Sequence, residues 1–246
     1  MAKRINRVIE LIESGEPVYY TGIGELTYEN GLKQASTWAD FLITDFEHHA
    51  FDVAGLTAFM KGLVDGGPTK AGHRTPAVIS TLPSNCRTIE EVRANAWQIR
   101  QVLSAGVHGI LHTHARQADA VRAFIEECRY PFHKEGREGL GEGQRGAGGQ
   151  GQPAEIWGVT PQRYTEIADP WPLNPEGECF LDSNLRIRNL QLIPMLFVVC
   201  RVWRSLSGVL VTWVCRSATR MLTIHRTQKR WTGFAMRSRV LPIVTA

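Results

Sequence analysis

The sequence lacks the cysteine patterns and the long apolar runs that define several classes of protein. Its five cysteines, Cys86, Cys128, Cys179, Cys200 and Cys215, form no CxxC pair and no spacing typical of metal ligands. No apolar run reaches the about 18 residues of a membrane-spanning helix, and Met1–Glu10 has no signal-peptide apolar core. We therefore expect a reduced, cytoplasmic protein with no membrane partner.

Carboxylates are almost missing from the last quarter of the chain. Residues 179–246 hold 11 Lys and Arg but only one acidic residue, Asp182, a net charge of +10. Residues 1–178 hold 17 Lys and Arg against 23 Asp and Glu, a net charge of −6. The basic segment is either a nucleic-acid-binding tail or a segment of different origin. Because it has no helix-turn-helix pattern, no RNP motif and no regular interleaving of aromatic with basic residues, nucleic acid is not the favoured partner.

Strand-like and helix-like segments alternate through the first 178 residues. The 246-residue length suits one α/β barrel or two small domains. Strands are expected at Pro17–Thr21, Phe41–Phe46, Thr75–Leu82 and Val107–Leu111. Helices are expected at Ile5–Ile12, at Glu29–Trp38, after Asp52, from the Thr88 capping box to Gly106, and over Val121–Cys128. This rhythm predicts a parallel sheet covered by helices.

The segment Phe41–Asp52, FLITDFEHHAFD, places four ionisable groups directly after a buried strand. Active sites of α/β proteins form at this end of their strands. A carboxylate three residues before a histidine can fix the imidazole tautomer and raise its basicity. We therefore interpret Asp45 as the orienting group, His48 as a general base and His49 as pointing elsewhere. The alternative is that these side chains only cap the next helix, for which Asp52 is placed.

Three further histidines accompany the fourth expected strand. His112 and His114 lie two residues apart, so on a regular strand they would face the same side as a metal pair or, more commonly, as polar rim residues. His108 lies inside the apolar run and is expected to be structural.

The segment Pro131–Gln152 is rich in glycine and contains Arg137 and Arg145. Two interpretations fit this composition. Glycine amides and an arginine can bind a carboxylate or phosphate, and a flexible surface loop is also rich in glycine. It has no GxxxxGK[ST] pattern and is not a nucleotide P-loop. Ile156–Glu178, rich in Pro and Trp, is expected to be an ordered connecting arm.

Several stretches of the first 178 residues resemble the HpcH/HpaI aldolase/citrate lyase family of pyruvate-type class II aldolases. They are DFEHHAFDVAGL, AGVHGILHTHARQADAVRAFIEECRYP and the RG of GQRGAGG; WGVTPQRYTEIADPWPLNPEGE is similar to one subgroup. The resemblance implies a (β/α)₈ TIM barrel of the phosphoenolpyruvate/pyruvate-binding type, incomplete here. It also implies a homo-oligomer, often a hexamer, and metal-dependent cleavage or formation of a carbon–carbon bond between a 2-oxo acid and an aldehyde. The motif places the family's catalytic pair on His48 and Asp45.

Two family features are missing from this chain. Related aldolases carry an arginine on the third strand, where TPAVISTLP has Ile79 or Ser80; Arg74 or Arg145 is a possible substitute in substrate binding. The family holds a divalent metal, Mg²⁺ or Mn²⁺, with one Glu and one Asp from later strands. Because Asp182 is the only carboxylate after Glu178, we expect no catalytic metal to be bound by this chain. It is therefore either an aldolase by descent or an inactive, damaged paralogue.

The composition of residues 179–246 is best explained by a shifted reading frame. Restoring one base after the Glu178 codon permits a translation that contains LEFED and, across Leu206–Ala218, EWGPGDMGMSFG. These strings resemble the family segments that carry the Glu and Asp metal ligands. Trp203 and Trp213 have single codons and leave no choice there. A barrel without its last strands would expose a sheet edge, so we expect an inactive, aggregation-prone product.

A nucleotide read across codons 178–246 checks this interpretation directly. We expect an alternative frame that encodes a GPGDMG string downstream of Glu178, because the family's metal-ligand segment would then be intact. A clean read in which neither other frame encodes it would refute the frameshift. A soluble, cooperatively unfolding 246-residue protein with aldolase activity would refute it equally.

Overall fold

The computed structural model describes residues 4–183, 199–201, 209–210 and 212–214. Six strands precede residue 184: β1 Val18–Gly22, β2 Phe41–Thr44, β3 Ala77–Ser80, β4 Gly109–His112, β5 Pro170–Trp171 and β6 Cys179–Ser183. The helices are α1 Arg7–Glu13, α2 Tyr28–Gln34, α3 Val53–Asp65, α4 Ile89–Ala94, α5 Ala96–Ser104, α6 Ala118–Cys128, α7 Gly151–Trp157 and α8 Pro161–Ile167. Three short strands follow: β7 Val199–Arg201, β8 Val209–Leu210 and β9 Thr212–Val214.

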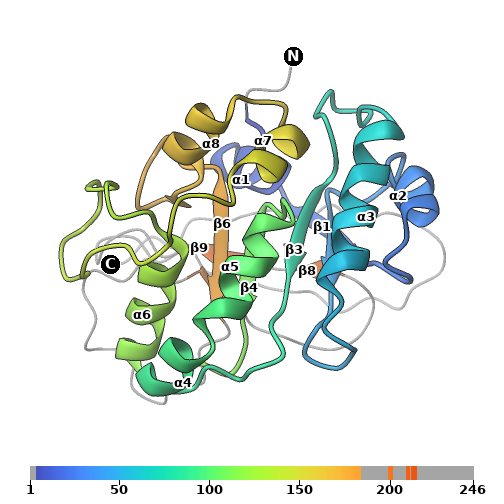
Figure 1. Ribbon diagram of the computed structural model, residues 1–246. Coiled ribbons are helices and arrows are strands. Elements are labelled where there is room, and N and C mark those ends of the chain that lie inside the picture. Colours follow the sequence, from blue (N-terminus) through green and yellow to red (C-terminus); the bar gives the residue numbers. More distant parts are fainter. Residues whose placement is uncertain (1–3, 184–198, 202–208, 211, 215–246) are drawn as a thin grey trace, which may run out of the picture.

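The central sheet is parallel, as the sequence predicts. Its strands are neighbours in the order β1-β2-β3-β4-β6, with β5 paired to β6 in parallel. Helices return the chain between successive strands and cover one side of the sheet (Figure 1). This alternation confirms the expected fold class and corresponds to part of a (β/α)₈ barrel. No described helix is long and apolar enough to cross a membrane.

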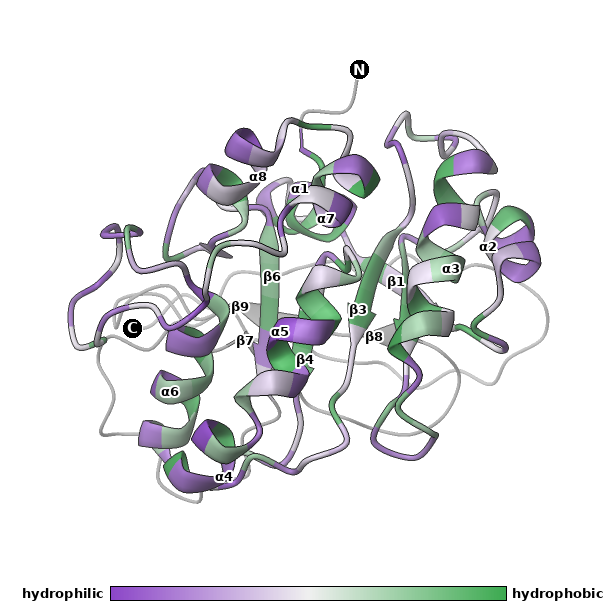
Figure 2. Cartoon of the chain, in the orientation of Figure 1, coloured by the Kyte–Doolittle hydropathy of each residue, from purple (hydrophilic) through white to green (hydrophobic). Residues whose placement is uncertain are grey.

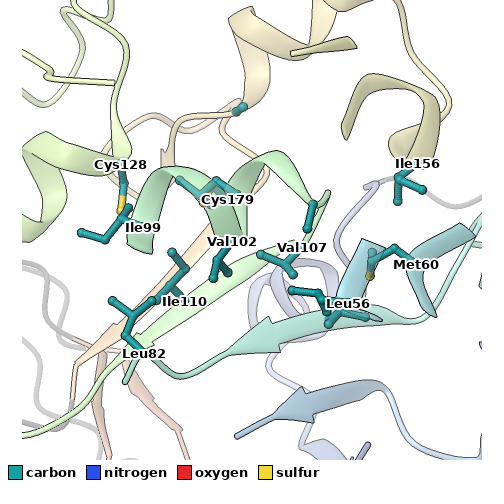
Figure 3. Packing of buried hydrophobic residues seen from close by; sticks show 14 of the residues in the cluster. Leu56, Met60, Leu82, Ile99, Val102, Val107, Ile110, Cys128, Ile156 and Cys179 are labelled. Carbon is teal, nitrogen blue, oxygen red and sulfur yellow. The ribbon is translucent and has the colours of Figure 1, made fainter. Parts of the chain in front are cut away.

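Both faces of the sheet are buried, which explains why its strands are continuous apolar runs. On the outer face, Leu42, Val78, Ile110 and Cys179 join a core with residues of α3, α5, α6 and α7. Figure 3 shows this layer, with Leu56 of α3 near Val107, and Ile110 of β4 between Val102 and Leu82. On the inner face, Phe41, Ile79, Leu111 and Phe180 pack with Val8 and Ile9 of α1. The helices turn apolar residues inward and polar residues outward (Figure 2).

The segment after Thr88 forms two helices, not the single helix expected to reach Gly106. Thr88 caps the first as predicted, accepting a hydrogen bond from the Glu91 amide. Asn95 then leaves helical geometry, with φ −109° and ψ 11°, and separates α4 from α5. Its side-chain amide donates to the Glu91 carbonyl at 2.8 Å, the same carbonyl to which its backbone amide donates at 3.2 Å. That local competition is why the apolar period alone misses the break.

The predicted boundary after Glu178 falls at the first residue of β6. Phe180 supplies the inner core and Cys179 the outer core, so these residues satisfy both faces of a parallel strand. β6 pairs with β4 through Gly109–Phe180 and Ile110–Leu181. Residues 179–183 of the basic segment are therefore part of the sheet, as are the described strands β7, β8 and β9, and most of its remainder lies outside the described residues.

Candidate active site

The polar segment after β2 is held as a compact turn by one carboxylate. Asp45 Oδ1 accepts hydrogen bonds from the amides of Glu47 and His48 at 3.1 and 3.3 Å and from the Thr81 hydroxyl at 3.2 Å. Phe46, between the polar residues, is buried in the outer core and contacts Phe51. The alternation of apolar and polar residues therefore anchors the turn and presents its ionisable groups at the carboxyl end of the strand.

Asp45 and His48 form a hydrogen-bonded pair, with His48 Nδ1 2.8 Å from Asp45 Oδ2. The hydrogen bond that His48 donates to Asp45, and the charge of that carboxylate, raise the pKa of His48 above its ordinary value. Burial alone would raise the pKa of Asp45, but the bond and charge of His48 lower it. The pair thus holds an ionised carboxylate behind an imidazole whose side chain is 68% exposed, an arrangement suited to a general base. His49 Nδ1 lies 3.0 Å from the Asp45 backbone carbonyl, away from the carboxylate.

A second carboxylate–imidazole contact lies at the same end of the sheet. His114 Nε2, from the loop after β4, is 2.5 Å from Glu47 Oε1. The same Glu47 oxygen is 4.0 Å from His48 Nε2. Sequence reasoning noted both residues but did not join them, because they are 67 positions apart. Thr81, on the loop after β3, also contacts this segment, and nothing in the sequence indicated this contact. Its hydroxyl donates to Asp45 and accepts a hydrogen bond from the Glu47 amide at 3.0 Å.

His112 and His114 do not face the same side, contrary to the expectation of a paired rim. Strand β4 ends at His112, and His114 adopts φ +59°, so strand alternation no longer applies between them. His112 is buried, its Nε2 2.7 Å from the Cys86 carbonyl, and burial lowers its pKa to about 4. His108 is buried and accepts from the Val78 amide at 3.1 Å, which makes it structural as predicted.

The structure does not bring Arg145 to the Asp45–His48 pair. Its guanidinium is buried, lies 4.7 Å from the Tyr130 ring centroid and donates to the Tyr164 hydroxyl at 2.8 Å. The Tyr164 hydroxyl donates to the carbonyl of Leu103, near the end of α5 and therefore at the amino ends of the strands. Arg74 also lies elsewhere, bonded to the Ile156 carbonyl. The glycine segment instead packs along α6, where Gly143 lies so close to the Arg129 and Tyr130 carbonyls that a side chain would clash.

The described residues do not supply the metal ligands that the family resemblance implies. Glu178 accepts from the Asn6 amide at 2.9 Å and pairs with Arg4. Asp182 lies two residues after Phe180, on the same inner face of β6, and is a single carboxylate. A Glu and an Asp from two later strands are therefore not found among residues 4–183. The group in this range whose ligand atoms lie within 4.8 Å of one another is Asp45, Glu47 and His48.

Enzymes built on parallel α/β sheets, α/β barrels among them, place their active sites at the carboxyl ends of the strands. The structure is similar to a HpcH/HpaI aldolase/citrate lyase family protein from Burkholderia cenocepacia J2315, at 15% identity and TM-score 0.51, covering 73% of this chain and 59% of that one. It also matches the HpcH/HpaI aldolase from Desulfitobacterium hafniense DCB-2 at 16% identity and TM-score 0.49, covering 72% and 56%. Macrophomate synthase matches at 15% identity and TM-score 0.45, covering 74% and 52%.

The comparison confirms the structural resemblance to the HpcH/HpaI aldolase fold that the sequence motifs predict. The chain spans just over half the length of these solved structures. No protein-family model and no curated protein matches the sequence.

Proposed function

We propose that residues 1–183 are the acid–base half of a carbon–carbon lyase acting on a 2-oxo acid and an aldehyde. The observation that supports this is the contact between His48 Nδ1 and Asp45 Oδ2 at 2.8 Å, at the carboxyl end of β2. In the cleavage direction, His48 Nε2 takes the proton from the hydroxyl of the aldol as the carbon–carbon bond breaks. In the addition direction, it returns that proton to the alkoxide.

Asp45 makes this proton transfer favourable in two ways. Its carboxylate holds the tautomer in which Nε2 is free to accept, and it stabilises the imidazolium that forms. Thr81 fixes Asp45 from the next strand, through the 3.2 Å bond to Oδ1. The described residues thus provide the base and its support, whereas the group that stabilises the enolate is not found among them.

Exchange of the methyl protons of pyruvate in D₂O is the direct test, because it needs no knowledge of the aldehyde. We expect exchange, followed by proton NMR, in a chain whose reading frame has been restored and which is given Mg²⁺ or Mn²⁺. We expect none in the 246-residue chain, since one catalytic half is missing. Absence of exchange in both, in a folded and metal-loaded restored chain, would exclude pyruvate enolate chemistry.

A further inference from the structure

The carboxyl ends of β2 and β4 carry two carboxylate–imidazole couples, and the proton transfer described above uses only one of them. Asp45 and His48 serve the hydroxyl of the aldol. We propose that Glu47, held in place by His114, is a second acid–base group, whose carboxylate exchanges the methyl proton of the 2-oxo acid. This inference rests on the proposed lyase reaction and assigns a further residue to it.

A carbon–carbon lyase of this kind moves protons at two different atoms. Cleavage takes a proton from the hydroxyl oxygen and leaves an enolate, whose carbon must gain a proton to become the methyl group of the 2-oxo acid. In the addition direction, the methyl group loses a proton and the oxygen of the aldehyde gains one. Because His48 Nε2 is engaged at the oxygen in both directions, a second group beside it completes the proton transfers at the carbon.

The spacing of the two couples suits two neighbouring targets on one substrate. Glu47 Oε1 lies 4.0 Å from His48 Nε2. In the aldol, the hydroxyl oxygen and the carbon that becomes the methyl group are two bonds, or about 2.5 Å, apart. Each proton-transfer atom must come within about 3 Å of its own target. Two groups at the observed separation can therefore reach both targets of one bound substrate at the same time.

The chemical types of the two groups match the two targets. Enzymes that enolise a carbonyl compound use a carboxylate to take the proton from carbon and an imidazole to serve the oxygen. Glu47 supplies the carboxylate and His48 the imidazole. The Glu47 side chain is 20% exposed and the His114 side chain 28% exposed, so a small ligand can reach this couple.

His114 is the positioning residue of the second couple. Its Nε2 lies 2.5 Å from Glu47 Oε1 and joins the end of β4 to the end of β2. His114 reaches this position with a left-handed backbone, φ +59°, which costs energy in a residue other than glycine and is common at functional sites. The Glu47 amide donates to Asp45 Oδ1 at 3.1 Å and to the Thr81 hydroxyl at 3.0 Å. Both ends of Glu47 are therefore held.

Exchange of the methyl protons of pyruvate in D₂O tests the role of Glu47, in a version of the chain with a complete barrel and loaded with Mg²⁺ or Mn²⁺. We expect Glu47→Gln to lower the exchange rate by about 10²-fold or more, because glutamine keeps the shape but cannot take the proton. His49→Ala is the matched control and should keep the parent's rate, since His49 Nδ1 lies against a backbone carbonyl.

A second assay separates the two couples. Release of the aldehyde from an aldol precedes protonation of the carbon, so it depends on His48 more than on Glu47. We expect His48→Ala to lower aldehyde release far more than exchange, and Glu47→Gln to lower exchange far more than aldehyde release. His114→Ala should lower exchange, and His114→Gln should restore part of it, because its amide can donate to the same carboxylate.

The contact between Glu47 and His114 is testable in the 246-residue chain without any activity. Diethyl pyrocarbonate acylates accessible imidazole nitrogens that are not hydrogen-bonded, and mass spectrometry of the peptides locates the label. We expect Glu47→Ala to raise the labelling rate of His114 several-fold and to leave that of His49 unchanged. Far-UV circular dichroism equal to the parent's establishes that the variant is folded.

The outcomes distinguish this inference from the reaction on which it rests. Exchange in the parent that stays within a few-fold in Glu47→Gln would overturn the role of Glu47 and leave the lyase proposal intact. A labelling rate of His114 that does not change in Glu47→Ala would overturn its positioning role. Absence of exchange in a folded, metal-loaded parent would overturn both proposals.

Discussion

Replacing His48 by Ala should lower turnover by about 10²-fold or more in a version of the chain with a complete barrel. A positioned general base contributes this much to proton transfer. The adjacent His49 cannot replace it, because its Nδ1 faces a backbone carbonyl and not the Asp45 carboxylate. The side chain is 68% exposed and contributes no packing to either core, so the loss should fall on kcat and leave the fold intact. Turnover is measured as release of pyruvate from test aldols.

His49→Ala is the matched control for this loss. The two histidines are adjacent, but His49 Nδ1 faces the backbone carbonyl of Asp45 while His48 Nδ1 faces its carboxylate. We expect a milder effect for His49→Ala, and for Asp45→Asn a loss closer to that of His48→Ala. Activity of His48→Ala within a few-fold of the parent would remove His48 from the mechanism.

The second large effect is expected on stability, from a buried ion pair at the amino ends of the strands. Asp169 is fully buried and accepts from Arg129 Nε at 2.7 Å and from Arg129 Nη2 at 2.8 Å. His133 Nδ1 lies 3.0 Å from the same carboxylate. Asp169→Asn leaves the guanidinium buried without its counter-charge, so the free energy of unfolding should fall by about 3–5 kcal/mol.

Urea unfolding followed by tryptophan fluorescence, at low protein concentration to suppress aggregation, measures this change. Glu166→Gln is the control, because its pair with Arg163 is exposed and should contribute little. Combining Asp169→Asn with Arg129→Met should restore part of the loss, since the unpaired charge is removed with its partner. A loss below about 1 kcal/mol in Asp169→Asn would show that the pair does not stabilise the fold.

The same pair predicts an acid-side dependence of stability. Burial alone would raise the pKa of Asp169, but the bonds from His133 and Arg129 lower it below its ordinary value. A carboxylate whose pKa is lower when folded stabilises the protein above its unfolded pKa of about 3.9. That contribution is lost as the pH falls through the folded value. The parent should therefore lose stability below about pH 4 more steeply than Asp169→Asn.

Features that depend on neighbours in sequence could be predicted from the sequence. The alternation of strands and helices follows from the apolar periods of each segment. The caps at Asp52 and Thr88 follow from a side chain that accepts a hydrogen bond from the amide three residues later, which is also a local contact. Asp45 and His48 meet because they are three positions apart in one turn. The helix break at Asn95 is also local, but there side-chain and backbone hydrogen bonds compete, and composition does not decide between them.

Contacts between distant segments were decided only by the tertiary structure. Glu47 and His114 meet because β2 and β4 end at the same edge of one parallel sheet, and Arg129 meets Asp169 because α6 and β5 begin or end at the opposite edge. Arg145 shows the converse: its glycine-rich context suggested an anion site, and packing instead placed it between Tyr130 and Tyr164. The sequence alone determined which groups can carry chemistry, because their type and local spacing are written in it. Strand register and helix packing determined which groups converge. The physical reason is that both faces of the sheet must be buried, and this requires all the strands and helices to pack together.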